Sequence, residues 1–393
     1  MTTPATQPGH ADLVARAQAL VPVLRERAPR TEELRRIPDD TVRDLHGSGL
    51  FRMLQPKRVG GSELSYEAIV ELTAIIGRGC GSTAWVLANL ANHHWMLALW
   101  PRDAQNEIWG PSADALVGSA LMFPAGHAER DGHGFRLSGH WKFSSGIDAC
   151  DWCMLGGIVH SAEGEMPEYY VFLVPKSDYI IIDTWHVAGL RGTGSKDVEV
   201  SDIFIPAHRA LSVNRMKGGV SAGGETAPLY QLAVFDMFPY VVAGAALGIA
   251  QGALEVFSED IRHRITAYST TLLADYATTQ ARLGHAAAAV SAAERVLMGG
   301  CREAMAIAAT EIPSQEQKIR LRRDGAYAAH LCTEAVDLLF GAGGGEFLYN
   351  QQTIQRSFRD IHAANSHYAL AWDISTTMAG KSLLGIATDL PTL

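Results

Sequence analysis

The sequence predicts a mainly helical α+β protein with a small β-domain between two helical domains. Apolar residues recur at helical spacing before about residue 115 and again after about residue 212. Between these limits lie short runs rich in β-branched and aromatic residues, separated by Gly, Pro and Asp turns. The chain has 393 residues, too many for one small core. We therefore expect an N-terminal helical domain over residues 1–115, a central β-barrel or sandwich over 116–212, and a C-terminal helical bundle over 213–393.

The N-terminal domain reads as a succession of amphipathic helices. The first is expected over residues 11–28, and the acids after Thr31 indicate the start of another. A further helix is expected over residues 65–77, and the next follows a cap at Thr83. This last helix is strongly apolar but carries His93, and a polar group in such a place is costly unless it is paired or faces open space.

The central and C-terminal regions differ in the spacing of their apolar residues, which is typical of strands in the first and of helices in the second. The expected strands are short runs over residues 116–123, 135–137, 141–144, 152–159, 169–174, 180–182 and 198–205. After a Gly- and Ser-rich loop, alanine-rich helical patterns suited to close packing return over residues 238–257, 283–309, 320–340 and 367–384.

Charge and cysteine usage exclude several classes of protein. The net charge of −9 argues against nucleic-acid binding and against an anionic membrane surface. No secretory signal and no apolar run of roughly 20 residues is seen, so we expect a cytoplasmic protein. Cys150 and Cys153 lack the second ligand pair that a zinc site needs, so they are expected to be buried thiols and no metal site is predicted.

Residues 137–152 combine aromatic bulk with small hydroxyls. Trp141 and Phe143 alternate along an expected strand, and Ser144 and Ser145 follow them before a glycine. This pattern suits a strand end that lies against a flat ring and hydrogen-bonds its edge. An ordinary half-buried strand that ends in a Ser-Gly turn is the alternative.

Four motifs in the same order give a resemblance that covers essentially the whole chain. Helices, a small β-domain and a four-helix bundle follow one another in the acyl-CoA dehydrogenase fold, and this sequence resembles that family. The matching motifs are the Pro and Gly-Gly loop at 54–61, the strand at 135–146, the loop at 189–195, and Arg356 with Arg359-Asp360 after the glycines at 341–345.

The departures from the family are equally informative. No carboxylate follows Arg359-Asp360 where the dehydrogenases place their base, and His367 is found nearby instead. Without that carboxylate, α,β-desaturation lacks its base. Phe123-Pro124 also replaces the family's Glu-Pro. The changed pattern is similar to the oxygenase components of two-component, reduced-flavin-dependent aromatic hydroxylases. These include 4-hydroxyphenylacetate and phenolic-steroid hydroxylases and oxygenases of indoles and aromatic polyketides.

This resemblance implies an oxygenase that acts through a flavin C4a-hydroperoxide on a phenolic, indolic or polyketide substrate. The implied cofactor is reduced FAD or reduced FMN, supplied by a separate NAD(P)H:flavin reductase, with molecular oxygen as co-substrate. A homotetramer is also implied. One of Ser144 and Ser145 would contact flavin N5, but the sequence does not choose between them, because a one-residue slip in a strand reverses the face.

Residue roles follow from the same resemblance. The catalytic candidates are His367, Ser144, Ser145 and His93. The substrate-binding candidates are His93, Ser119, Phe123 and Phe238. The cofactor-binding candidates are Trp141, Phe143, Ser144, Ser145, Arg191, Thr193, Arg262, Arg264, Gly341, Gly343 and Gly344.

Three other functions stay open at this point. The first is a desaturase with a different base, and the second is an N-oxygenase of an amine or amino sugar on the same fold. The third is a flavin-binding scaffold without catalysis, since fold alone does not fix function. A GxGxxG fingerprint after a strand is absent, so no Rossmann NAD site is indicated, in keeping with delivery of reduced flavin by a partner.

Overall fold

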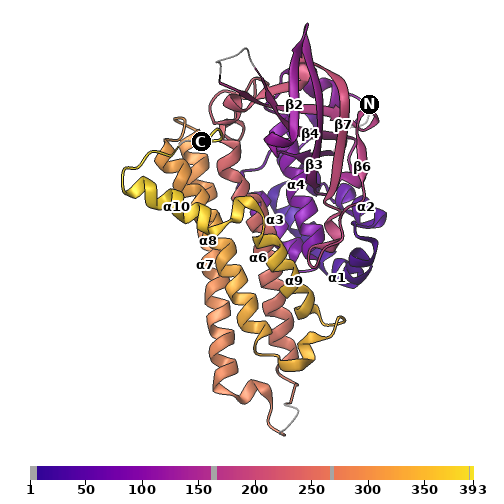
Figure 1. Ribbon diagram of the computed structural model, residues 1–393. Coiled ribbons are helices and arrows are strands. Elements are labelled where there is room, and N and C mark those ends of the chain that lie inside the picture. The colour runs from indigo at the N-terminus through magenta and orange to yellow at the C-terminus, as the bar shows by residue number, and fades with distance from the viewer. Residues whose placement is uncertain (1–6, 161–165, 266–269, 389) are drawn as a thin grey trace.

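The computed structural model describes residues 7–160, 166–265, 270–388 and 390–393, which form two helical regions around one sheet (Figure 1). The N-terminal helices are α1 (His10–Leu34), α2 (Asp39–Ser48), α3 (Glu67–Gly77), α4 (Gly81–Leu97) and α5 (Arg102–Trp109). The strands are β1 (Val117–Ala120), β2 (Gly126–Asp131), β3 (Gly134–Ser144), β4 (Trp152–Val159), β5 (Glu168–Pro175), β6 (Ile180–Ile182), β7 (Lys196–Pro206) and β8 (Ala210–Ser212). The C-terminal helices are α6 (Val234–Asp260), α7 (Ala277–Ala308), α8 (Gln315–Phe340), α9 (Thr353–Asn365) and α10 (Trp372–Leu383).

Helix α1 is one continuous helix, so the expected helix start after Thr31 is wrong. The Thr31 hydroxyl donates to the Arg27 carbonyl one turn earlier and does not cap a new helix. The acid that follows, Glu32, is used in an ion pair with the C-terminal region. Acids in a first turn and acids in a long-range ion pair look alike in a sequence.

The β-domain is a single mixed sheet in the order β6-β7-β3-β2-β4-β5-β8, with β1 paired to β4. The two edge strands of this path, β6 and β8, do not pair with each other among the described residues. The sheet is therefore not closed by hydrogen bonds along this path, but it curls over on itself, because Phe135 on β3 contacts Phe172 on β5 with ring centroids 5.3 Å apart. Strands β3 and β7 form a long antiparallel pair, with register shifts at 137/139 and at 141/144.

The C-terminal helices form the expected bundle around α6. This helix packs against α7, α8 and α9 on one side and against α3 and α4 on the other. It is long and apolar enough to cross a membrane, but 72% of its most apolar window is buried inside the protein, as in a core helix. The predicted fold class, with a four-helix bundle after the β-domain, is confirmed.

The last expected helix, over residues 367–384, begins later in the structure, and the helix before it, α9, was not expected. α9 ends at Asn365 and α10 begins at Trp372, and His367 lies in the connection. The His367 ring accepts a hydrogen bond from the backbone N–H of Ala369, which caps a short 3₁₀ turn and redirects the chain.

Helix α9 fastens the N-terminal helix to the loop before β7. Glu32 accepts from Arg356 Nε at 2.8 Å and from Arg359 Nη1 at 2.6 Å, and all three side chains are largely buried. Arg359 also donates to the carbonyl of Ala188 at 2.8 Å. The two guanidiniums hold the pKa of Glu32 below its usual value against the opposing effect of burial.

We predict that Glu32→Gln destabilises the protein by about 3 kcal/mol, because it leaves two largely buried guanidiniums without their anion. Urea unfolding followed by tryptophan fluorescence measures the change. Glu33→Gln, at the exposed position next to it, is the matched control and should leave stability unchanged. Equal stability of the two variants would contradict a structural role for the ion pair.

Candidate functional site

The end of β3 is distorted where the sequence places its aromatic and hydroxyl side chains. A register shift between Trp141 and Ser144 marks a bulge, and Phe143 has a left-handed backbone with φ of +68°. Such a conformation is rare and costly for a residue with a side chain, and it is found mainly where function requires it. The Phe143 ring is 59% exposed as a result.

The bulge sends the neighbouring side chains to opposite sides. Trp141 is fully buried and its indole donates to the Gly156 carbonyl at 2.7 Å. Ser144 is also fully buried, with its hydroxyl 3.7 Å from the sulfur of Cys153. The side chains of these two candidates therefore lie inside the β-domain. Ser145 is partly exposed and points toward α4.

Trp85 on α4 joins Ser145 to His367. Its indole N–H donates to the Ser145 hydroxyl at 3.1 Å. Its ring meets the His367 ring edge to face, with centroids 5.6 Å apart. The sequence analysis did not select Trp85, although it lies about two helical turns before His93 on a helix already singled out. We call Ser145, Trp85, His367 and Phe143 the serine site.

His367 is neutral in this arrangement. Its Nδ1 accepts from the Ala369 backbone N–H at 3.2 Å, so in the neutral ring the proton lies on Nε2. Neighbouring atoms desolvate the ring and lower its pKa to about 4, although His367 is an exposed residue at the surface of this chain. His367 is thus an N–H donor at physiological pH.

His93 is buried between α4 and β1. Its Nδ1 donates to the Val117 carbonyl at 2.6 Å, and burial lowers the pKa of the ring to about 4. The neutral ring therefore keeps its lone pair on Nε2. Ser119 lies two residues after Val117 on β1, on the same side of the strand, and is partly exposed.

Two of the predicted substrate-binding residues meet in one aromatic cluster. Phe123 contacts Tyr169 and Phe235, with ring centroids 5.6 and 6.1 Å apart, and Phe235 contacts Phe238 at 5.3 Å. We call Phe123, Tyr169, Phe235 and Phe238 the aromatic cluster. Phe235 and Tyr169 were not predicted from the sequence, because nothing in their spacing distinguishes them from core residues.

The loop before β7 lies against both helical regions. The Leu190 N–H donates to Asp360 at 2.6 Å, and burial raises the pKa of that carboxyl to about 7. Thr193 is buried, and its hydroxyl bonds the Leu190 carbonyl and the Ser195 hydroxyl. Arg191 is exposed, and its side chain makes no ion pair in the described ranges. Of the two predicted contacts in this loop, only Arg191 is free to meet a ligand directly.

A second group of predicted cofactor residues lies at the end of the bundle away from the β-domain, around the α6–α7 connection (Figure 1). Arg264 pairs with Asp260 at 2.7 Å and lies 4.6 Å from the centroid of the Phe347 ring. Arg262 is exposed beside Glu259. One chain therefore does not bring Arg262 and Arg264 together with Ser145.

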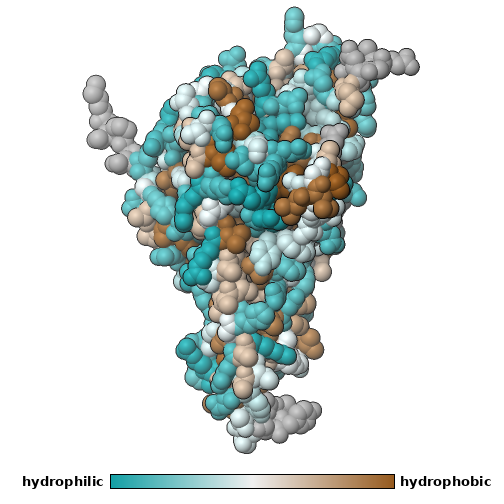
Figure 2. All heavy atoms as spheres, turned by 90° about the vertical axis from the view of Figure 1, so that its left-hand side faces the viewer, coloured by the Kyte–Doolittle hydropathy of each residue, from teal (hydrophilic) through white to brown (hydrophobic). Residues whose placement is uncertain are grey.

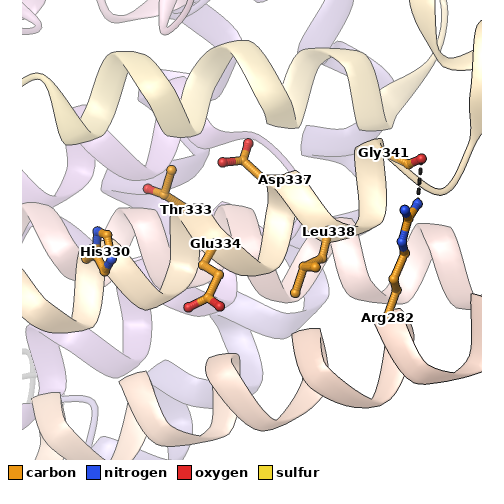
Figure 3. A pocket seen from close by; sticks show the side chains of 7 residues that line it. All are labelled: Arg282, His330, Thr333, Glu334, Asp337, Leu338 and Gly341. Carbon is orange, nitrogen blue, oxygen red and sulfur yellow. Dashed lines mark hydrogen bonds between the residues drawn. The ribbon is translucent and has the colours of Figure 1, made fainter. Parts of the chain in front are cut away.

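The glycine segment lies near the same end of the bundle. Gly341 lines a cavity of about 420 Å³ between α7 and α8, where its carbonyl accepts from Arg282 at 2.7 Å (Figure 3). Glu334 and Asp337 line the same cavity, and carboxylates do not suit a phosphate. This cavity shares no residue with the serine site. Phe347 fills the space where a side chain on Gly343 would lie, and Gly344 has a left-handed φ of +64°.

No group of three or more His, Cys, Asp or Glu side chains is placed to hold a metal ion within the described ranges. Cys150 and Cys153 are buried free thiols, and burial raises the pKa of each.

Comparison with known proteins gives full-length matches. Models of the acyl-CoA dehydrogenase N-terminal and C-terminal domains match residues 12–113 and 240–372. The oxygenase subunit HsaA, a flavin-dependent monooxygenase of Rhodococcus jostii (strain RHA1), is 36% identical over 94% of this chain and 98% of its own length. The FADH(2)-dependent resorcinol hydroxylase, oxygenase component, of Rhizobium sp. (strain MTP-10005) is 32% identical over 98% of this chain and 96% of its own. XiaF from Streptomyces sp., in complex with FADH2 and glycerol, superposes with a TM-score of 0.91 at 30% identity over 98% of each chain.

The chain belongs to the acyl-CoA dehydrogenase family. Within that family it is an oxygenase component of the flavin-dependent monooxygenases, which confirms the resemblance seen in the sequence.

The buried histidines predict an acid-sensitive fold. The folded-state pKa of His93, about 4, lies below the usual value near 6.5. The unfolded state therefore binds more protons between these values, and stability that is complete above pH 6.5 is lost as the pH falls toward 4. We predict that His93→Gln removes up to about 3 kcal/mol of this pH dependence. Urea unfolding from pH 4.5 to 7.5 measures it, with His133→Gln on the exposed surface as the control. A variant whose stability falls as steeply as that of the wild type would contradict the assignment.

Proposed function

We propose that this chain uses reduced flavin and molecular oxygen to hydroxylate a small aromatic compound, of phenolic, indolic or polyketide type. The observation that carries the proposal is the serine site. A partly exposed hydroxyl and a neutral imidazole are joined there by Trp85, and the exposed ring of Phe143 lies two residues before the hydroxyl on the distorted end of β3. The names of the relatives, which include resorcinol and p-hydroxyphenylacetate hydroxylases, support the substrate class.

The side chains at the serine site fit a flavin ring. Phe143, which is 59% exposed, and Tyr368, which follows His367 and is 69% exposed, would offer apolar surface for a flat ring system, and Ser145 would offer a hydrogen bond to its edge. Reduced FAD or FMN would supply the oxygen activation and transfer that protein side chains do not supply. Arg191, which is exposed and lies two residues before Thr193, would meet the same group. Arg262, Arg264, Gly341, Gly343 and Gly344 would meet the cofactor of a second copy, because they lie at the opposite end of this chain.

The two histidines have different tasks in this proposal. His367 presents Nε2–H and donates a hydrogen bond next to Trp85. His93 presents the Nε2 lone pair and accepts from the O–H or N–H of the substrate, which makes the substrate ring more nucleophilic. A pKa of about 4 makes His93 a hydrogen-bond acceptor more than a full proton acceptor at neutral pH. Ser119, Phe123 and Phe238 would line the same substrate position.

The desaturase alternative lacks a base. Residues 361–371 contain no Asp or Glu, and the carboxylate of Asp360 accepts from the Leu190 N–H inside the protein. An α-proton of an acyl chain would therefore have no carboxylate to receive it at this end of α9.

The remaining partners are proposed from chemistry and surface. A separate NAD(P)H:flavin reductase would supply the reduced flavin, since the sequence carries no Rossmann fingerprint after a strand. We propose a homotetramer, supported by apolar patches on the face that carries α7 and α10 (Figure 2) and by Leu383 and Leu384, which are 82% and 76% exposed. The cytoplasm, where reduced pyridine nucleotides are available, is the proposed location.

The test is product formation in a reconstituted system. The protein, a flavin reductase, NADH and FAD or FMN are incubated under ¹⁸O₂ with a panel of phenols and indoles, and products are analysed by mass spectrometry. Incorporation of one ¹⁸O atom into an aromatic product supports the proposal. The proposal would be contradicted if no oxygenated product formed and if oxidised FAD copurified with the protein and was bleached by acyl-CoA. That result would support the desaturase alternative.

We predict that Ser145→Ala uncouples the reaction. It should lower product formed per NADH consumed by about tenfold, the equivalent of one lost hydrogen bond, and raise hydrogen peroxide release. Ser144→Ala, at the neighbouring serine that faces Cys153, should have a much smaller effect. The reverse order of the two variants would show that the hydroxyl on the interior side of the bulge is the functional one.

A further inference from the structure

Four groups form a continuous hydrogen-bonded chain that leads inward from the serine site. The Trp85 N–H donates to the Ser145 hydroxyl at 3.1 Å, and this hydroxyl lies 2.9 Å from that of Ser195. The Ser195 hydroxyl lies 2.7 Å from that of Thr193, which lies 2.9 Å from the Leu190 carbonyl oxygen. We call Ser145, Ser195, Thr193 and Leu190 the hydroxyl relay. Ser195 and Thr193 are 4% and 1% exposed, so their polar atoms depend on each other.

A count of hydrogens fixes the direction of this relay. Three hydroxyl hydrogens serve three oxygen–oxygen contacts, and the last contact ends on a carbonyl, which only accepts. Thr193 must donate to Leu190, Ser195 to Thr193, and Ser145 to Ser195. The reverse direction would leave the Thr193 oxygen 2.9 Å from the carbonyl oxygen with no hydrogen between them.

The carbonyl that ends the relay is held in place. Leu190 has a left-handed φ of +50°, and its N–H is fixed by Asp360 at 2.6 Å. Its carbonyl also accepts from the Trp185 indole and from the Thr193 backbone N–H, each at 3.1 Å. The peptide groups on both sides of the Leu190 Cα are therefore held, so the 190–191 peptide has little freedom to turn a donor toward Thr193, and the direction of the relay is built into the fold.

The direction of the relay decides what Ser145 offers to a ligand. Its hydrogen is directed inward to Ser195, and one of its two lone pairs takes the Trp85 N–H. The remaining lone pair is the only hydrogen-bonding capacity that Ser145 has left for the outside. Ser145 is therefore an acceptor toward the serine site.

We propose that the hydroxyl relay makes Ser145 a fixed hydrogen-bond acceptor, so that the site selects reduced flavin over oxidised flavin. Reduced flavin carries a hydrogen on N5 and donates there, whereas oxidised flavin has a lone pair on N5, which an acceptor repels. This inference rests on the proposed function, in which Ser145 meets the flavin edge. Ser195 and Thr193 act as positioning residues, because they set the proton of Ser145 without touching the ligand.

The test measures dissociation constants of both redox states for the same protein. Oxidised FMN and FAD are titrated in air, reduced FMN and FAD are titrated anaerobically, and the ratio of the two constants is compared among variants. Thr193→Val removes one hydroxyl at nearly constant shape and frees Ser195, and through it Ser145, to turn its hydrogen outward. Oxidised flavin should then bind more tightly relative to reduced flavin by about tenfold, the equivalent of one hydrogen bond.

Three further variants separate direction from mere disruption. Thr193→Ser keeps the hydroxyl and should keep the wild-type ratio. Ser195→Ala frees the Ser145 hydrogen directly and should shift the ratio as Thr193→Val does. Ser201→Ala, at an exposed serine on β7, controls for loss of a hydroxyl elsewhere. Melting temperatures show whether each variant is folded.

The outcomes distinguish the relay from the function on which it rests. Wild-type protein that binds no flavin in either state would overturn the proposed function and the relay with it. Wild-type protein that binds flavin, with the same ratio in Thr193→Val and Ser195→Ala, would overturn the relay and leave the function standing. A ratio that shifts in Thr193→Ser as much as in Thr193→Val would also overturn it, since the hydroxyl would then be irrelevant.

Discussion

The ion pair between Glu32 and the two arginines of α9 is the contact on which the site depends most. It joins the first helix to the last part of the bundle, and Arg359 extends it to the carbonyl of Ala188. The next residue of α9, Asp360, holds the Leu190 N–H. The loop before β7, which carries the inner half of the hydroxyl relay, is therefore bound to α9, and α9 is bound to α1. If α1, α9 or the loop before β7 moved apart, the Ser145 hydroxyl would no longer be held in one direction.

This fastening explains how unfavourable local geometry persists near the site. Leu190 and Phe143 both have left-handed backbones, which cost free energy for residues with side chains. Leu190 is held through both its N–H and its carbonyl. A side chain on Gly189 would overlap the Arg359 carbonyl, so the loop packs closely on α9. Phe143 lies between two ladder contacts of β3 and β7 that are out of register by the bulge. In both places long-range contacts hold a conformation that the local sequence disfavours.

The sequence predicted the order of the elements well because that order depends on period and turn residues, which are local. It did not choose between Ser144 and Ser145, because the choice depends on a bulge at Phe143 that pairing with β7 creates. It also did not show that the Trp141 indole is buried and donates to the Gly156 carbonyl. It also overlooked Trp85 and Ser195, whose roles arise only when α4 and the loop before β7 meet the end of β3. The motifs showed which residue types belong to the site, but they did not show the direction in which each side chain points.

The backbone partners of the two histidines, His93 and His367, give them their roles more than charge does. Each has its pKa lowered to about 4, so neither carries a charge near neutral pH. The two rings differ in whether Nδ1 donates to or accepts from the backbone. A carbonyl takes the Nδ1 hydrogen of His93, and an N–H takes the Nδ1 lone pair of His367. The same imidazole thus becomes an acceptor in one place and a donor in the other. Ser145 follows the same rule, since the chemistry it offers is set by the partner that holds its hydrogen.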